Sequence, residues 1–192
     1  YQHSGIDYKA IFRAVRAAIE NGEVTQGGST ITQQLARTIF LTQDRTWQRK
    51  VEEMFIATEL EKKYSKNQIL EFYLNNIYFG NGYYGLQAAS RGYFNTEVSN
   101  LDLSQIAFLC AIPNNPTLHD PLTNMENTLG RRDRILKNMY EDGKISKGAY
   151  LMAKSEEIVL NRPEHTKNNY VETYTYYCAI RLLMEWEGFK FQ

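Results

Sequence analysis

The sequence has few cysteines, few histidines and few prolines. It contains 2 cysteines, 3 histidines and 4 prolines in 192 residues. No H-E-x-x-H or C-x-x-C spacing occurs, and no G-x-S-x-G turn is present, so zinc enzymes and serine hydrolases of that type have no support. Cys110 and Cys178 lie far apart in apolar helical patterns, where we expect buried free thiols rather than a disulfide or a metal site.

The sequence also lacks an excess of charge and a long apolar run. Lys plus Arg and Asp plus Glu number 22 each, so the chain has no overall basic field and is not expected to bind nucleic acid. Any anion site must be local. No stretch reaches the roughly 18 apolar residues of a transmembrane helix, and no signal segment opens the chain. Hydrophobic residues at 43% and charged residues at 23% are ordinary values for a folded domain.

Apolar residues recur mainly at three- and four-residue steps, and runs of β-branched residues are scarce. This pattern predicts an all-α fold. The expected helices cover about 8–21, 29–41, 46–63, 66–76, 84–91, 102–112, 125–140, 146–154 and 168–187.

Two local signals refine this prediction. Ser65 and Gln68 have the spacing of a capping box at the start of the 66–76 helix. The segment from Phe79 to Gly85 contains a G-x-G-x-x-G pattern, but a helix precedes it where a dinucleotide-binding loop needs a strand. We therefore interpret these glycines as a tight reversal of the chain.

The segment Gln26 to Arg37 places two glycines and the hydroxyls of Ser29 and Thr30 directly before a helix. Free amides at a helix start bind anions, and Arg37 extends the positive surface two turns further along. The alternative is that Ser29 or Thr30 is only an N-cap.

A basic cluster follows, with Arg45 and Arg49 one helical turn apart and Lys50 beside them. Together with Arg37, these side chains could clamp a diphosphate, because guanidinium groups bind phosphate oxygens in a bidentate way. The alternative is a solvated basic face.

Glu53 falls on the same helix side as Ile56, Ala57 and Leu60, whereas Glu52 falls on another side. A carboxylate on an apolar stripe either has a partner or carries a function. Burial and nearby cations shift its pKa in opposite directions, as in a tuned catalytic acid. From the spacing alone, a structural ion pair with an arginine is the simpler explanation.

Taken together, these segments resemble the family 51 glycosyltransferases, the peptidoglycan-polymerising domains of penicillin-binding proteins and of monofunctional transglycosylases. The resemblance covers essentially the whole chain and rests on five motifs in order. They are His3-x-Gly5-Ile6-Asp7, the segment from Gln26 to Arg37, Arg49-Lys50-x-x-Glu53, Ile69-Leu70-Glu71-Phe72-Tyr73-Leu74-Asn75, and Arg131-Arg132-x-x-Ile135-Leu136.

The resemblance implies a lysozyme-like fold in which a large lobe and a small membrane-proximal lobe surround a cleft. It implies an inverting polymerisation of lipid II onto a lipid-linked glycan with release of undecaprenyl diphosphate, at the extracytoplasmic face of the bacterial cytoplasmic membrane. The implied partners are lipid II, the nascent glycan, the membrane surface, a C-terminal transpeptidase domain and other cell-wall synthesis proteins.

The resemblance also implies roles for individual residues. Glu53 matches the second catalytic glutamate, which assists departure of the diphosphate directly or through a divalent cation (Mg²⁺ or Mn²⁺), although no cofactor is required. Arg37, Arg49 and Lys50 would contact phosphate. The donor site would be lined by Ser29, Thr30 and Gln34.

The family's general base, a glutamate, normally lies upstream of the position of His3. We therefore expect the chain as given to recognise its substrate but to polymerise it poorly, since a positioned acid or base contributes about 10²- to 10⁴-fold in rate. We assign residues 1–165 to the glycosyltransferase domain and 166–192 to its last helix or to a linker. The alternatives are a noncatalytic module that binds lipid II or glycan, and a lysozyme-like glycan hydrolase, although a hydrolase has no use for a diphosphate clamp.

Overall fold

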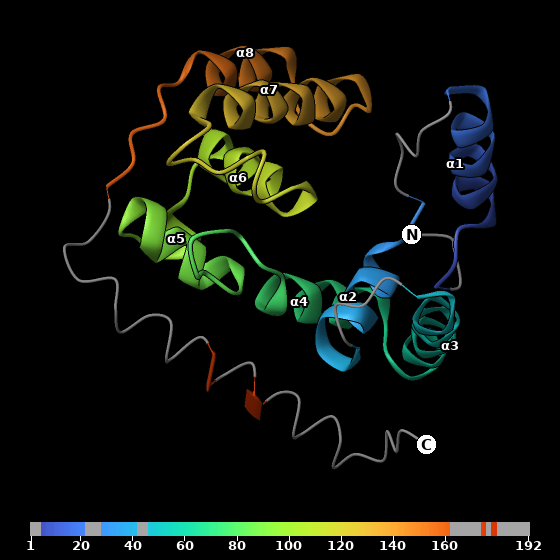
Figure 1. The fold of residues 1–192 in the computed structure, drawn as a ribbon. Coiled ribbons are helices and arrows are strands. Elements are labelled where there is room, and N and C mark those ends of the chain that lie inside the picture. Colours follow the sequence, from blue (N-terminus) through green and yellow to red (C-terminus); the bar gives the residue numbers. More distant parts are fainter. Residues whose placement is uncertain (1–4, 22–27, 42–45, 162–173, 176–177, 180–192) are drawn as a thin grey trace. The chain divides into compact units, whose positions relative to one another are not determined.

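The structure, a computed structural model, describes residues 5–21, 28–41, 46–161, 174–175 and 178–179. Within these ranges the chain is helical, with no strand and one isolated antiparallel bridge between Tyr78 and Tyr84 (Figure 1). The all-α class predicted from the sequence is thus confirmed. The α-helices are α1 (Tyr8–Asn21), α2 (Ile31–Phe40), α3 (Trp47–Lys63), α4 (Lys66–Asn76), α5 (Leu86–Phe94), α6 (Leu103–Ala111), α7 (Met125–Glu141) and α8 (Lys147–Ser155), and the short 3₁₀ helices are η1 (Val98–Asn100) and η2 (Ile112–Asn114).

The chain forms two compact units, Tyr1–Asn76 and Ile77–Gln192. The predicted cleft between two lobes therefore stays a prediction, and the predicted domain boundary at residue 165 lies outside the described residues.

Most helix boundaries agree with the predicted ones within two residues. The exception is α5, which was predicted at 84–91 and instead runs to Phe94. Gly85, with φ of 84°, delays its start, and Asn95, in the left-handed region with φ of 53°, sets its end. The predicted helix at 168–187 lies almost wholly outside the described residues.

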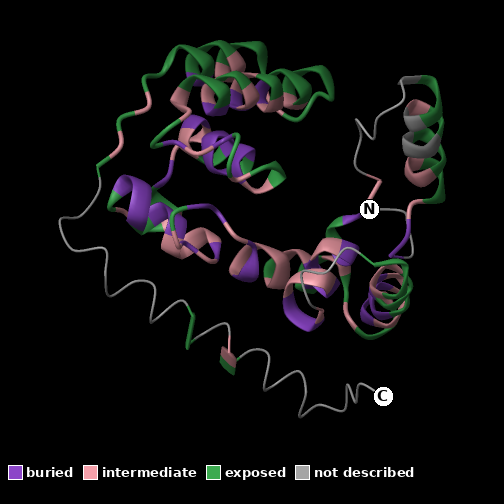
Figure 2. Cartoon of the chain, viewed as in Figure 1, coloured by how far each residue is buried: buried purple, intermediate pink, exposed green. Residues whose placement is uncertain are grey.

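In the first unit, α2 packs against both α3 and α4. Apolar side chains of all three helices are buried, and Figure 2 shows buried residues on each of them. Gly5 lies against α3, where a Cβ atom would come within 2.8 Å of the Ala57 carbonyl oxygen, and its φ of 91° also favours glycine. The buried apolar side chains of the three helices are Leu35, Ala36, Ile39, Phe40, Ile56, Ala57, Leu60 and Ile69.

Side-chain caps fix where these helices begin. Thr30 caps α2 and Thr46 caps α3, each accepting a hydrogen bond from the backbone N–H three residues on. The predicted capping box of α4 is confirmed, because the Ser65 N–H donates to Gln68 Oε1 at 3.0 Å and the Gln68 N–H donates to Ser65 Oγ at 3.3 Å.

In the second unit, α6 packs against α7, and α8 packs on both. Ala107, Leu136 and Ala153 form one buried cluster, and Phe108 and Leu109 are fully buried. The expected burial of Cys110 is wrong, since this free thiol is exposed. The reason is that Ala107, Phe108, Leu109 and Ala111 take the inward side of α6 and turn position 110 outward.

The predicted reversal at 79–85 is confirmed. Gly80, Gly82 and Gly85 all have positive φ, and the Tyr83 N–H donates to the Gly80 carbonyl at 2.9 Å. The preceding element is α4 rather than a strand. This segment is therefore a turn and not a dinucleotide-binding loop.

Candidate functional site

The start of α2 is organised by Thr30. Its hydroxyl accepts from the Gln33 N–H at 3.1 Å and donates to the Gly5 carbonyl at 2.7 Å. The Thr30 N–H donates to Gln33 Oε1 at 3.0 Å, which completes a capping box. The N-cap alternative is thus confirmed for Thr30, whereas Ser29 lies one residue before the cap and is half-buried.

The first turns of α3 carry two cations. Thr46 Oγ1 accepts from the Arg49 N–H at 3.1 Å. This cap sets the start of α3 and so places Arg49 and Lys50 in its first turn. Cations near the positive end of a helix dipole are unfavourable by a few tenths of a kcal/mol up to about 1 kcal/mol. Such a local conflict is typical of functional positions.

Glu53 compensates this charge. Its side chain is fully buried, with 0% exposure, and Oε2 lies 3.0 Å from Arg49 Nη1 while Oε1 pairs with Lys50 Nζ. Its predicted place on the buried stripe of α3 is confirmed. The predicted ion pair with an arginine is present too, and the added lysine gives each carboxylate oxygen its own cation.

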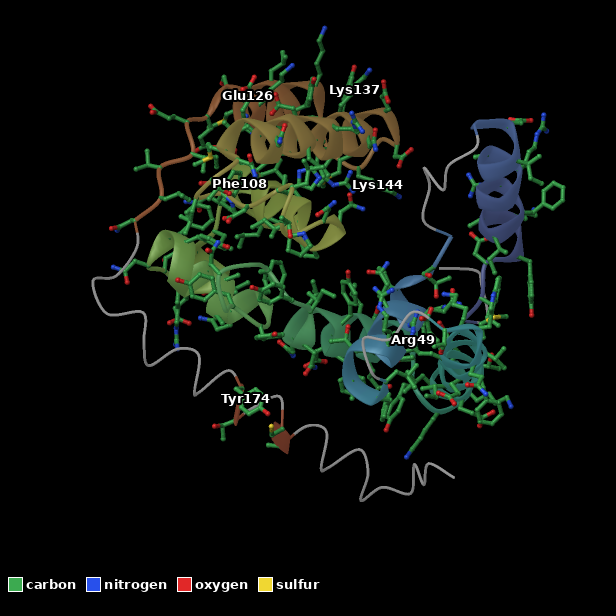
Figure 3. The ribbon with its side chains drawn as sticks, viewed as in Figure 1. Arg49, Phe108, Glu126, Lys137, Lys144 and Tyr174 are labelled. Carbon is green, nitrogen blue, oxygen red and sulfur yellow. The ribbon has the colours of Figure 1, made fainter. Side chains whose placement is uncertain are left out.

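Lys50 also joins the two helix starts. Its Nζ donates to Ser29 Oγ at 2.8 Å, across 21 residues of sequence. The structure thus brings Ser29, Arg49, Lys50 and Glu53 together in the first unit, and Figure 3 shows Arg49 beside α2 and α3. We call these four residues the Glu53 cluster.

The remaining predicted site residues, Gln34, Arg37 and Arg45, are not part of the Glu53 cluster as the structure describes it. Gln34 Oε1 accepts a hydrogen bond from the Tyr73 hydroxyl at 3.2 Å. Arg37 is half-buried in the last turn of α2. Arg45 lies outside the described residues. Sequence reasoning did not include Tyr73 among the site residues, and its position in the fourth motif was the signal that could have suggested it.

The charges of the Glu53 cluster do not cancel. Two cations face one carboxylate, and Arg49 Nε is buried with no hydrogen-bond partner within the described part of the chain. A buried donor without a partner costs about 1–3 kcal/mol, so an oxyanion that accepted from it would be stabilised. The geometry is suited to binding an anion beside a buried carboxylate.

A divalent cation fits these residues poorly. Across the described ranges, no group of three or more His, Cys, Asp or Glu side chains could hold a metal ion. Glu53 contributes one carboxylate, and both of its oxygens already face cations. Mg²⁺ and Mn²⁺ prefer oxygen ligands free of competing positive charge, so Glu53 between its two cations is a poor ligand for either ion.

Comparison with known proteins gives one family and a set of relatives. The family model described as Transglycosylase matches residues 1–140. Penicillin-binding protein 4 of Bacillus subtilis (strain 168) is 40% identical over 191 residues, which cover 98% of this chain and 30% of that protein. Penicillin-binding protein 1F of the same organism is 45% identical over 174 residues, which cover 91% of this chain and 24% of that protein.

Among solved structures, penicillin-binding protein 1A from Haemophilus influenzae aligns with a TM-score of 0.49 and 24% identity, over 79% of this chain and 19% of that one. The chain thus spans less than a third of the length of the curated relatives named above. None of the described helices is both long and apolar enough to cross a membrane.

Proposed function

The chain belongs to the transglycosylase family, and from that premise we propose that it is a peptidoglycan glycosyltransferase domain that polymerises lipid II into glycan strands. The observation that carries the proposal is the buried Glu53 carboxylate held by Arg49 and Lys50. The reaction needs a cationic site for a leaving diphosphate, and this cluster has that character.

In the proposed reaction the 4-hydroxyl of lipid II attacks the anomeric carbon of the lipid-linked glycan from the face opposite the diphosphate. A bond forms between that hydroxyl oxygen and the anomeric carbon. The bond from the anomeric carbon to the diphosphate oxygen breaks, and its electron pair stays on undecaprenyl diphosphate. The configuration at the anomeric carbon is therefore inverted.

Arg49 and Lys50 would stabilise the negative charge that develops on the leaving oxygen, because charge-assisted hydrogen bonds from fixed donors strengthen as that charge grows. Glu53 would hold both cations in place before the substrate arrives. Ser29 would orient Lys50 through the 2.8 Å hydrogen bond between them. Gln34 and Arg37, on α2, would extend the donor site.

The setting is proposed from the relatives. The two Bacillus subtilis relatives are penicillin-binding proteins much longer than this chain. We place the domain in such a longer protein, acting beside a transpeptidase domain and other cell-wall synthesis proteins at the extracytoplasmic face of the cytoplasmic membrane. The proton acceptor for the 4-hydroxyl is the glutamate that the family resemblance places upstream of His3.

Lipid II polymerisation, followed on a gel, tests the proposal with the chain extended upstream by a Glu-Asp segment. Glu53→Gln should lower polymer formation by about 10²-fold or more, because it removes the charge that positions Arg49 and Lys50. Glu52→Gln is the matched control, since Glu52 is the exposed neighbour on the same helix and should leave the rate unchanged.

Normal polymerisation by Glu53→Gln would contradict the role of Glu53. Binding of lipid II without polymer from either protein would favour the noncatalytic module. Shortening of added glycan strands would favour the hydrolase. Unfolding in urea should be recorded for both variants, so that a lost fold is not mistaken for a lost reaction.

A further inference from the structure

His119 is a buried histidine in the second unit that the proposed reaction does not use. His119 lies in the loop between η2 and α7 and is only 8% exposed. The ring faces the backbone of Asn127 in the first turn of α7, which acts on the His119 pKa. Its Nδ1 atom is buried and has no hydrogen-bond partner among the described residues.

Two arginines of α7 accompany this ring. Asn127, Arg131 and Arg134 follow one another at steps of four and three residues, so they share one face of the helix. Arg131 is half-buried, and its Nε atom, like His119 Nδ1, is buried without a partner within the described part of the chain. Arg134 is exposed, so the group opens to solvent on its side.

No carboxylate of the described residues forms an ion pair with Arg131 or Arg134. Asp120, next to His119, is engaged elsewhere, because its Oδ1 accepts from Asn81 Nδ2 at 2.8 Å and from the Leu122 N–H at 3.0 Å. Asp133 pairs with Arg132 at 2.8 Å.

The lack of a counter-charge is reflected in the pKa values of His119 and Arg131, both of which are lowered. Burial, followed by the charge of Arg131 and then that of Arg134, lowers the pKa of His119, although the Asn127 backbone opposes the shift. Burial and the charge of Arg134 lower the pKa of Arg131. Without a counter-charge, these three side chains destabilise one another's charged forms.

We propose that His119, Arg131 and Arg134 form a binding site for a phosphate group. The site shares no residue with the Glu53 cluster and does not depend on the proposed reaction. A phosphate oxygen would accept from Arg131 Nε and from a protonated His119 Nδ1, which satisfies both buried atoms, and Arg134 would supply a further charge at the open side.

Phosphate fits better than a carboxylate because two guanidinium groups accompany a histidine that can take up a proton, and a phosphate carries up to two negative charges with several acceptor oxygens. The same chemistry could come from inorganic phosphate, from a diphosphate or from a lipid headgroup. A bound anion favours the charged imidazole, so it should raise the pKa of His119 from its lowered value.

The test follows the His119 ring by NMR in the full chain while inorganic phosphate is added at constant ionic strength. We expect a saturable shift of the ring signal and a higher His119 pKa in the bound form. Arg131→Gln should weaken the binding about tenfold or more. Lys137→Gln removes one charge from the same helix, at an exposed residue paired with Glu141, and should leave the binding unchanged.

Sulfate serves as a second probe because its charge is constant between about pH 5 and 7.5, where a histidine titrates. Its affinity should rise as the pH falls through the His119 pKa of the bound form, and His119→Phe should remove this dependence. Arg134→Gln tests the site at an exposed position if Arg131→Gln does not fold.

Pyrophosphate and phosphatidylglycerol vesicles identify the source. If pyrophosphate binds more tightly than phosphate, the site is supported and its ligand is a diphosphate. If the His119 signal shifts only with vesicles, the site is supported and its ligand is a lipid headgroup. The proposal is overturned if no probe shifts the His119 signal, or if Arg131→Gln and Arg134→Gln bind phosphate as the unchanged chain does. The polymerisation assay is not used, so these outcomes are independent of the proposed function.

Discussion

At the scale of single residues, the polar groups buried in this protein differ in how they are satisfied. Glu53 has a cation on each oxygen, and Tyr93, which is fully buried, donates its hydroxyl to the Phe79 carbonyl at 2.8 Å and accepts from Asn81 Nδ2 at 2.9 Å. His119 and Arg131 each retain one buried atom without a partner among the described residues. These two atoms, together with Arg49 Nε, are the ones that we interpret as parts of anion sites.

Tyr93 gives a pH prediction. Burial is the main cause that raises its pKa above the usual value near 10. The unfolded chain therefore loses the phenolic proton first, and the stabilisation is present below about pH 10 and declines as the pH rises above it, by at most about 1.4 kcal/mol per pH unit.

Tyr93→Phe should cost about 1–3 kcal/mol of unfolding free energy at pH 7, because the Phe79 carbonyl loses its donor in the core. This difference should narrow as the pH rises above about 10, since phenylalanine does not ionise. Urea unfolding of both proteins at several pH values measures it. A difference that stays constant up to about pH 11 would contradict the raised pKa.

At the scale of helices, two glycines that look alike in the sequence have different surroundings. Gly92 lies inside α5 against the ring of Tyr83, and Gly130 lies inside α7 on the exposed side. A Cβ atom at position 92 would lie 2.2 Å from Tyr83 Cζ, whereas one at position 130 would have nothing within 4 Å.

Gly92→Ala and Gly130→Ala should therefore change stability in opposite directions. Gly130→Ala should stabilise the protein by about 0.5–1 kcal/mol, because alanine favours a helix interior over glycine. Gly92→Ala should destabilise it by about 1–3 kcal/mol, because Tyr83 is itself only 2% exposed and has little room to move. Urea unfolding of the two variants measures both changes in unfolding free energy. If Gly92→Ala stabilised the protein as much as Gly130→Ala does, the close contact with Tyr83 would be refuted.

At the scale of the whole molecule, the two units depend on different kinds of contact. The first is held by α2 against α3 and α4, with the Glu53 cluster between the starts of α2 and α3. In the second, Arg132 joins three helices. Its guanidinium donates to Ser104 Oγ of α6 at 3.2 Å and to the Lys154 and Glu156 carbonyls at the end of α8, at 3.1 and 3.0 Å.

Arg132→Met should destabilise the second unit by about 1–3 kcal/mol, because it leaves the buried Ser104 hydroxyl and the partly buried carbonyls at the end of α8 without their charged donor. Hydrogen exchange should show faster exchange of the α8 amides and unchanged exchange of the α4 amides in the first unit. Lys137→Met on the same helix is the control and should change stability by less than about 1 kcal/mol, as for an exposed ion pair. Equal protection of α8 in both variants would show that Arg132 does not hold it.

The sequence by itself determined the helical class, nearly all of the described helix boundaries and the inward side of α3 that carries Glu53. These features follow from neighbouring residues, since helix periodicity and caps act within about four residues. It also grouped Arg49, Lys50 and Glu53, because they share the first turns of one helix.

Only the tertiary structure decided the contacts between distant segments. The Lys50 bond to Ser29, the Thr30 bond to Gly5 and the place of His119 against α7 all depend on how helices pack, which sequence spacing does not encode. For the same reason Cys110 turned outward while its neighbours filled the core. The chemistry of the residues is local, but which of them meet is a property of the packed chain.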